Sequence, residues 1–168
     1  MGLVTAYGPS STYDAMQGGL ASSVRGPDGQ ALVRTLEDYR NGVSTYVTLA
    51  GNPDFYGNTY SIPSITYNYG GQTFTLENVP AVVHDTGAAF RNAKEGRFDI
   101  PVAQDLTMAQ LSAQPFSKSN IDFAPLSTED FVSRVAAPAA PPTAAFSNSA
   151  PPVDGGIRSA FDLGAPAA

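Results

Sequence analysis

Glycine and proline recur along this chain so closely that no long helix fits between them. The sequence holds 16 glycines and 14 prolines among 168 residues, and both residue types interrupt regular helices. Hydrophobic residues still make up 42% of the chain, including eight tyrosines and nine phenylalanines. That supply is enough to build a core. The pattern therefore excludes coiled coils, long-helix bundles and wholesale disorder, at a length that suits one domain.

The chain is acidic and lacks cysteine. Nine basic and fifteen acidic side chains give a formal net charge of -6, so nothing offsets repulsion from phosphate groups and we expect no nucleic-acid partner. Without cysteine there is no disulfide, thiolate zinc site or cysteine nucleophile. No apolar run reaches the ~18 residues of a membrane span. The N-terminal sequence also lacks the basic and apolar regions of a signal peptide.

The composition changes abruptly after Val135. Residues 136–168 contain eleven alanines and six prolines, a mixture that favours extended polyproline II and buries no core. We predict a folded domain over residues 1–135 and an extended arm over residues 136–168. Three apolar side chains between positions 157 and 163 are suited to docking on a partner protein.

Most of the folded domain is predicted to form short β-strands. Runs rich in β-branched and aromatic residues between glycine and proline turns indicate strands. They lie at Leu3–Tyr7, Ser44–Ala50, Thr59–Tyr69, Gln72–Leu76 and Val79–His84. Gly70 and Gly71 separate two of these runs and predict a hairpin. The pattern alone predicts a mainly β fold, either a small barrel or a sandwich.

Three short helices are predicted from their capping residues. They are a segment from Thr35 to Gly42, a segment that begins at Thr107, and a segment that begins at Ser127. In the third helix, we expect Phe131, Val132 and Val135 to face the core.

His84 is the only histidine, so any histidine triad or histidine metal site depends on it. It alternates with Val83 along a predicted strand, which favours a plain surface or strand-end position. A zinc site here would need three carboxylates as further ligands, which is an uncommon set for that metal. We therefore expect neither a metal nor another cofactor.

Two aspartates are stronger candidates for chemistry. Asp85 and Asp99 each lie beside an apolar stretch, where strands begin or end. Apolar surroundings raise the pKa of a carboxyl group and make it a usable general acid, and a second carboxylate nearby adds to this effect or orients the first. On pattern alone, the alternative is that both aspartates cap turns or accept backbone hydrogen bonds.

Two short motifs resemble the 3D domain, a family named for three aspartates. They are Val82-Val-His-Asp-Thr-Gly-Ala-Ala-Phe90 and Gly96-Arg-Phe-Asp-Ile100. The segments Val4-Thr-Ala-Tyr-Gly8 and Tyr46-Val-Thr-Leu-Ala-Gly-Asn-Pro53 also resemble the family's first two strands. The likeness covers about residues 3–104. It implies a six-stranded double-psi β-barrel, as in membrane-bound lytic transglycosylase A, here with short peripheral helices and the extended C-terminal arm.

The resemblance also implies a reaction. In the family's transglycosylase a single aspartate acts as acid and base, which gives Asp99 this role and makes Asp85 the neighbour that orients it. The reaction cleaves the β-1,4 bond between N-acetylmuramic acid and N-acetylglucosamine in a peptidoglycan glycan strand. The muramic 6-hydroxyl then closes a 1,6-anhydro ring. One carboxylate suffices for this, whereas ordinary glycosidases use two.

The sequence departs from the family at two motif positions. Asn52 stands where the first aspartate is expected, and Ala88 stands in place of a glycine. Asn52 can keep a hydrogen-bonding role but not the charge. A glycan groove needs aromatic faces and hydrogen-bond donors, and the candidate substrate-binding residues are Tyr7, Tyr13, Tyr56, Tyr69, Asn52, Thr86 and Gly87. The tyrosines suit ordinary barrel packing equally well.

Together these inferences predict a protein that resembles peptidoglycan lytic transglycosylases. We expect it in a phage virion or tail, where the arm over residues 136–168 binds other virion proteins, or exported to the cell wall or periplasm. The alternative is a non-catalytic structural or assembly barrel of a virion, or a peptidoglycan-binding module. An open groove lined by Asp85 and Asp99 favours the enzyme.

Overall fold

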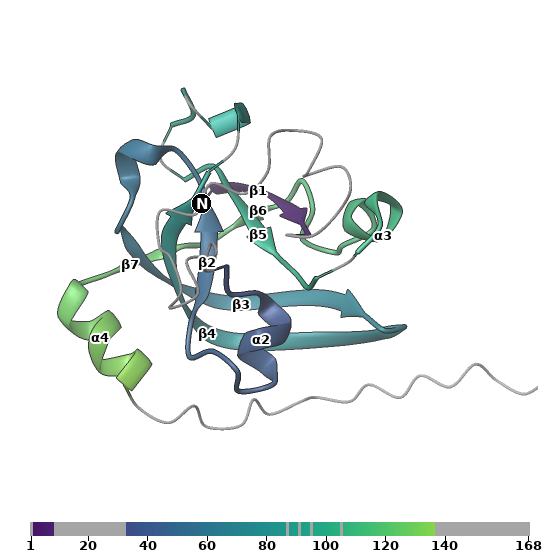
Figure 1. Ribbon diagram of the computed structural model, residues 1–168, viewed down its shortest axis with the longest axis horizontal. Helices are drawn as coiled ribbons and strands as arrows, with labels where there is room; N and C mark the ends of the chain where they lie inside the picture. The colour runs from purple at the N-terminus through teal and green to yellow at the C-terminus, as the bar shows by residue number, and fades with distance from the viewer. Residues whose placement is uncertain are drawn as a thin grey trace, which may run out of the picture.

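The structure is a computed structural model that describes residues 2–8, 33–86, 88–90, 92–94, 96–104 and 106–136 (Figure 1). Strands account for 41% of the described residues and helices for 23%, which confirms the prediction of a mainly β fold. Two predicted site residues, Tyr13 and Gly87, lie outside the described residues, as does nearly all of the predicted arm.

In the described part of the chain, seven strands form one mixed sheet in the order β6-β1-β5-β2-β4-β3-β7. Their bounds are β1 Gly2–Tyr7, β2 Val47–Ala50, β3 Thr59–Tyr69, β4 Gln72–Asp85, β5 Phe98–Pro101, β6 Asn120–Ile121 and β7 Ala124–Leu126. The resemblance predicted six strands, whereas the described sheet has seven, of which the very short β6 and β7 form the two edges. These two edge strands do not pair with each other, so the sheet as described is not closed.

Two parallel strand pairs meet at the centre of the sheet. β1 pairs in parallel with β5, and β2 pairs in parallel with β4, whereas β2 and β5 are antiparallel. All four residues of β2 are buried, as expected for a strand that is covered on both faces. β2 is therefore the element around which the two pairs are assembled.

β3 and β4 form a long hairpin around Gly70 and Gly71, as predicted. Both glycines have positive φ, at 58° and 77°, which is the backbone conformation that type I′ hairpin turns need. The strands predicted at Gln72–Leu76 and Val79–His84 are in fact one continuous strand, β4. Asn78 lies between them with a φ of 53°, a conformation that asparagine tolerates better than most residues.

The helices and 3-10 turns are short. Their bounds are α2 Leu36–Arg40, η1 Pro53–Phe55, η2 Ala88–Phe90, α3 Met108–Ser112 and α4 Thr128–Ala136. Thr35 caps α2 and Thr107 caps α3, as predicted. Each threonine forms a capping box with the residue three positions later. Ser127 accepts a hydrogen bond from the Asp130 amide at the start of α4, so all three helix starts are confirmed.

α4 packs less deeply than the sequence predicted. None of its residues is fully buried, and Val132 is 54% exposed; the expectation that Val132 faces the core is wrong. The helix lies outside the sheet beside β3 and β4 (Figure 1). Phe131 contacts the Tyr46 ring edge to face at 5.8 Å, and Arg134 donates to Ser61 Oγ at 3.1 Å. Only one side of the helix therefore meets the sheet.

The sheet curls around the main hydrophobic core. Tyr60 of β3 contacts Phe98 of β5 with ring centroids 5.3 Å apart, although β4 and β2 lie between these strands. Phe123 packs against both rings, at 5.9 and 4.8 Å. In a flat sheet, strands three positions apart are separated by about 14 Å. The aromatic contacts therefore require strong curvature.

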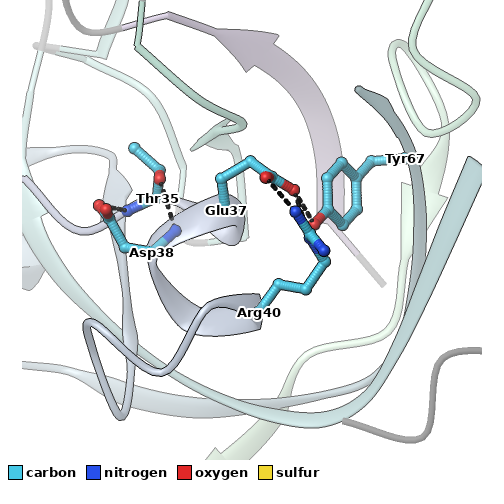
Figure 2. Close-up of polar contacts among 5 residues, drawn as sticks. All are labelled: Thr35, Glu37, Asp38, Arg40 and Tyr67. Atoms are coloured by element: carbon cyan, nitrogen blue, oxygen red, sulfur yellow. Dashed lines mark hydrogen bonds and ion pairs between the residues drawn. The ribbon is translucent and has the colours of Figure 1, made fainter. Parts of the chain in front are cut away.

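A partly buried ion pair within α2 contacts the hairpin through Tyr67 and Phe74 (Figure 2). Arg40 donates to both carboxylate oxygens of Glu37, at 2.8 and 2.7 Å, and the Tyr67 hydroxyl donates to Glu37 Oε1 at 2.5 Å. The Arg40 guanidinium also lies 4.2 Å from the centre of the Phe74 ring. Glu37 is 7% exposed and Tyr67 is fully buried. These hydrogen bonds therefore replace the hydration that both groups lose on folding.

The pH dependence of folding reports on this ion pair. Burial alone would raise the pKa of Glu37, but hydrogen bonds from Arg40 and Tyr67 bring the pKa below its usual value of 4.5. The pair's stabilisation is therefore fully present above about pH 4.5 and is lost as the pH falls further. We expect Glu37→Gln to lower the free energy of unfolding by about 1–3 kcal/mol at pH 7 and by less at acid pH. Urea denaturation at both pH values measures this, and an equal loss at both would contradict the assignment.

Candidate functional site

Ala50, the last residue of β2, lies between the two motif aspartates. It is in register with Asp99 of β5 on one side and with Asp85 of β4 on the other. Neighbouring strands are about 4.8 Å apart, so the backbones of the two aspartates lie roughly 10 Å apart. The structure thus brings both predicted catalytic residues to the same end of β2.

A β-bulge in β4 determines which residue lies beside Ala50. Leu49 pairs with Val83, but Ala50 pairs with Asp85, so His84 is the extra residue of the bulge. The Gly51 amide donates to the Asp85 carbonyl at 2.9 Å, which holds the shifted register. His84 itself is half-buried, and burial lowers its pKa below the usual 6.5.

Asp85 is completely buried. Its exposed fraction is 0%, and two donors reach its carboxylate at 2.8 Å: the Tyr7 hydroxyl at Oδ2 and the Thr86 backbone amide at Oδ1. These donors compensate for the hydration that the carboxylate loses. A carboxylate in this position does not contact a polymeric substrate. Its contribution to a site is to hold neighbouring groups in place.

Asp99 is more accessible than Asp85. It is half-buried, and its Oδ1 accepts a hydrogen bond from the Thr5 hydroxyl. Its neighbours Phe98 and Ile100 are buried in the main core. Because side chains alternate along a strand, Asp99 faces the opposite side of the sheet from that core. Of the two aspartates, Asp99 is the one that a substrate can approach.

Tyr7 is a packing residue with a polar contact, not an exposed stacking surface. It is 6% exposed and packs with Ala50 and Phe90 in a small second hydrophobic cluster. Its hydroxyl is the donor to Asp85. This cluster covers the sheet face opposite the main core, at the end of β2.

Two other predicted tyrosines lie in different places. Tyr56, just after η1, is half-buried and packs against the main core; burial and the negative charge of Asp85 both raise its pKa above the usual 10. Tyr69 is 37% exposed at the hairpin turn. It is roughly 33 Å along β3 from Thr59, which pairs with Val82 near Asp85. The structure does not bring Tyr69 to the site.

Asn52 ties the end of β2 to the segment between the aspartates. It is 8% exposed. Its Nδ2 donates to the Ala93 carbonyl at 2.9 Å, and its Oδ1 accepts from the Asp54 amide at 3.0 Å. The side-chain amide thus donates one hydrogen bond and accepts another, both with backbone groups. Asn52 therefore holds neighbouring segments in place and does not face a substrate.

Thr5 is the site residue that the sequence analysis did not single out. Its hydroxyl donates to Asp99, its register partner on the neighbouring parallel strand. Thr5 and Tyr7 alternate with the buried Val4, so both lie on the face that carries the aspartates. The alternation of side chains along the strand could have predicted the face on which Thr5 lies. The sequence does not predict that Asp99 is its partner on the neighbouring strand.

Other kinds of site are not found in the described part of the chain. Within it, no group of three or more histidine, aspartate or glutamate side chains could hold a metal ion. None of its helices combines the length and apolarity needed to cross a membrane. A polar pocket of about 260 Å³ lies between the start of β3, β7 and the start of α4, with Asn58, Tyr60 and Thr128 in its lining. Neither aspartate lines it.

Comparison with protein-family models, curated proteins and solved structures finds no match for this chain. The functional interpretation therefore rests on the residues around Ala50 and on the two motifs that carry the aspartates.

Gly51 leaves no room for a side chain between the two aspartate strands. A Cβ there would lie 3.1 Å from Phe98 Cδ1 and 3.3 Å from Val83 Cγ1. We expect Gly51→Ala to lower the free energy of unfolding by about 1–3 kcal/mol through overpacking. Gly8→Ala is the matched control, because its Cβ would meet its nearest atom at 3.4 Å, and should change stability by about 0.5 kcal/mol or less. Equal losses in urea denaturation would contradict this packing.

Proposed function

We propose that this chain is a peptidoglycan lytic transglycosylase-like protein in which Asp99 is the single acid and base. One observation carries the proposal: both motif aspartates lie beside Ala50, with Asp99 accessible and Asp85 buried. Two carboxylates in such different environments are suited to different roles. The accessible one exchanges protons with substrate, and the buried one holds the surrounding strands.

The proposed reaction needs one carboxyl group that acts twice. Protonated Asp99 donates its proton to the glycosidic oxygen as the bond between N-acetylmuramic acid and N-acetylglucosamine breaks. The resulting carboxylate accepts the proton of the muramic 6-hydroxyl, whose oxygen attacks C1 and closes the 1,6-anhydro ring. No water is consumed, and Asp99 ends the cycle protonated.

We further propose that the sheet is a double-psi β-barrel. One contact on the core face supports closure beyond the described pairings: Tyr60 of β3 packs on Phe98 of β5. A flat sheet would keep these two strands about 14 Å apart. Two further points stay predictions from the sequence. One is a location in a virion or at the cell wall, and the other is an arm over residues 136–168 that binds virion proteins.

A non-catalytic structural or glycan-binding barrel is the second candidate function. The complete burial of Asp85, with donors from Tyr7 and Thr86, favours it. A carboxylate that holds strands together serves an assembly module as well as an enzyme. Asn52 in place of the family's first aspartate points in the same direction, because both of its side-chain hydrogen bonds among the described residues are with backbone groups.

Digestion of purified peptidoglycan tests the enzymatic proposal. We expect the wild-type protein to release 1,6-anhydro-muropeptides, detected by mass spectrometry. We expect Asp99→Asn to release at least about 100-fold less, because an amide cannot exchange the proton. Glu129→Gln is the matched control, since it neutralises an exposed carboxylate on α4, and should be fully active.

The products separate the candidate functions. Products with ordinary reducing ends would contradict the transglycosylase mechanism. If the wild-type protein releases no product but sediments with peptidoglycan, the binding module is favoured. If it neither releases product nor sediments with peptidoglycan, the structural barrel is favoured. Thermal unfolding of Asp99→Asn checks that a loss of activity does not reflect a loss of fold.

A further inference from the structure

One strand, β1, supplies a hydroxyl group to each aspartate. Thr5 donates to Oδ1 of Asp99, and Tyr7 donates to Oδ2 of Asp85. Residues two positions apart on a strand share a face. The two donors are therefore carried side by side by the same rigid backbone, although the aspartates themselves belong to β5 and β4.

We propose that Thr5 is the positioning residue for Asp99: its hydroxyl fixes the orientation of the carboxyl group for proton transfer. The catalytic part of this inference rests on the proposed function. Thr5 does not touch the reacting atoms and acts through Asp99. Tyr7 has the corresponding position beside Asp85, so the segment Thr5–Tyr7 sets the geometry of both carboxylates.

The local structure explains why a threonine suits this task. Parallel pairing places Thr5 directly beside Asp99, so the separation of the two side chains is set by the sheet. The β-branched side chain of threonine restricts rotation about χ1 and holds its hydroxyl in a defined direction. The hydrogen bond from Thr5 restricts rotation of the Asp99 carboxyl group about χ2. Misplacement by about 1 Å reduces the rate of a catalysed step on the order of 100-fold.

The hydroxyl has an electrostatic effect as well. A donor that bonds to a carboxylate favours its charged form. Removing the Thr5 hydroxyl should therefore raise the pH at which Asp99 titrates, whether or not the protein has catalytic activity. This gives the inference a readout that does not depend on turnover.

Three variants test the inference. Thr5→Val removes the hydroxyl at nearly constant shape, and Thr5→Ser keeps it. Thr66→Val is the matched control, because Thr66 shares a hydroxyl hydrogen bond with Thr75 on the hairpin, away from the aspartates. The measurements are the Asp99 carboxyl titration by carbon-13 NMR, and kcat and KM for release of anhydro-muropeptides as a function of pH.

We expect Thr5→Val to shift the Asp99 titration midpoint upward and to lower kcat roughly 10- to 100-fold with little change in KM. Thr5→Ser should restore both values towards those of wild type, and Thr66→Val should change neither. An unchanged midpoint in Thr5→Val, or a serine variant that behaves like the valine variant, would overturn the positioning role.

The outcomes also distinguish this inference from the proposed function. A shifted midpoint in Thr5→Val, together with an inactive wild-type protein, would retain the positioning contact and refute the lytic activity. An active wild-type protein with unchanged kcat and titration in Thr5→Val would retain the activity and refute the positioning role. A fall in unfolding free energy without either change would show that the hydroxyl only stabilises the sheet.

Discussion

The register of β2 is the constraint on which the site depends. This short buried strand pairs in parallel with β4 and antiparallel with β5, so its last residue, Ala50, is shared by both neighbours. Because side chains alternate along strands, a slip of one position would turn one neighbour's aspartate to the other face. The bulge at His84 and the hydrogen bond from the Gly51 amide to the Asp85 backbone carbonyl fix the pairing that places both carboxylates beside Ala50.

β1 completes this arrangement by donating hydroxyl groups to both carboxylates. The two aspartates therefore differ in environment: Asp85 is fully buried beside Tyr7 and its small apolar cluster, whereas Asp99 is half-buried. Differences in environment are what let two identical groups take different chemical roles. A second polar cluster lies away from the site: Glu37 and Arg40 of α2 form an ion pair, and Tyr67 of the hairpin donates a hydrogen bond to Glu37. It joins α2 to the hairpin.

The sequence predicted the features that local chemistry determines. The paired glycines of the hairpin and the helix caps have short-range causes, and each was found at the predicted position. The sequence did not predict the bulge at His84, the contact of Thr5 with Asp99 or the pairing of Tyr67 with Glu37, because each depends on which strands become neighbours. The exposed face of α4 was missed for a related reason: its amphipathic pattern does not say how deeply the helix packs. The edge strands β6 and β7 are too short to leave a pattern.

We propose that the end of β2 is where this chain binds a glycan strand. The most direct test is an amide NMR titration of nitrogen-15-labelled Asp99→Asn protein with soluble oligomers of the N-acetylglucosamine–N-acetylmuramic acid repeat. We expect the largest shifts at Thr5, Ala50 and position 99, and none at the hairpin turn around Tyr69. Shifts confined to the hairpin turn or to the pocket at the start of β3, or no shifts at saturating oligomer, would contradict this proposal.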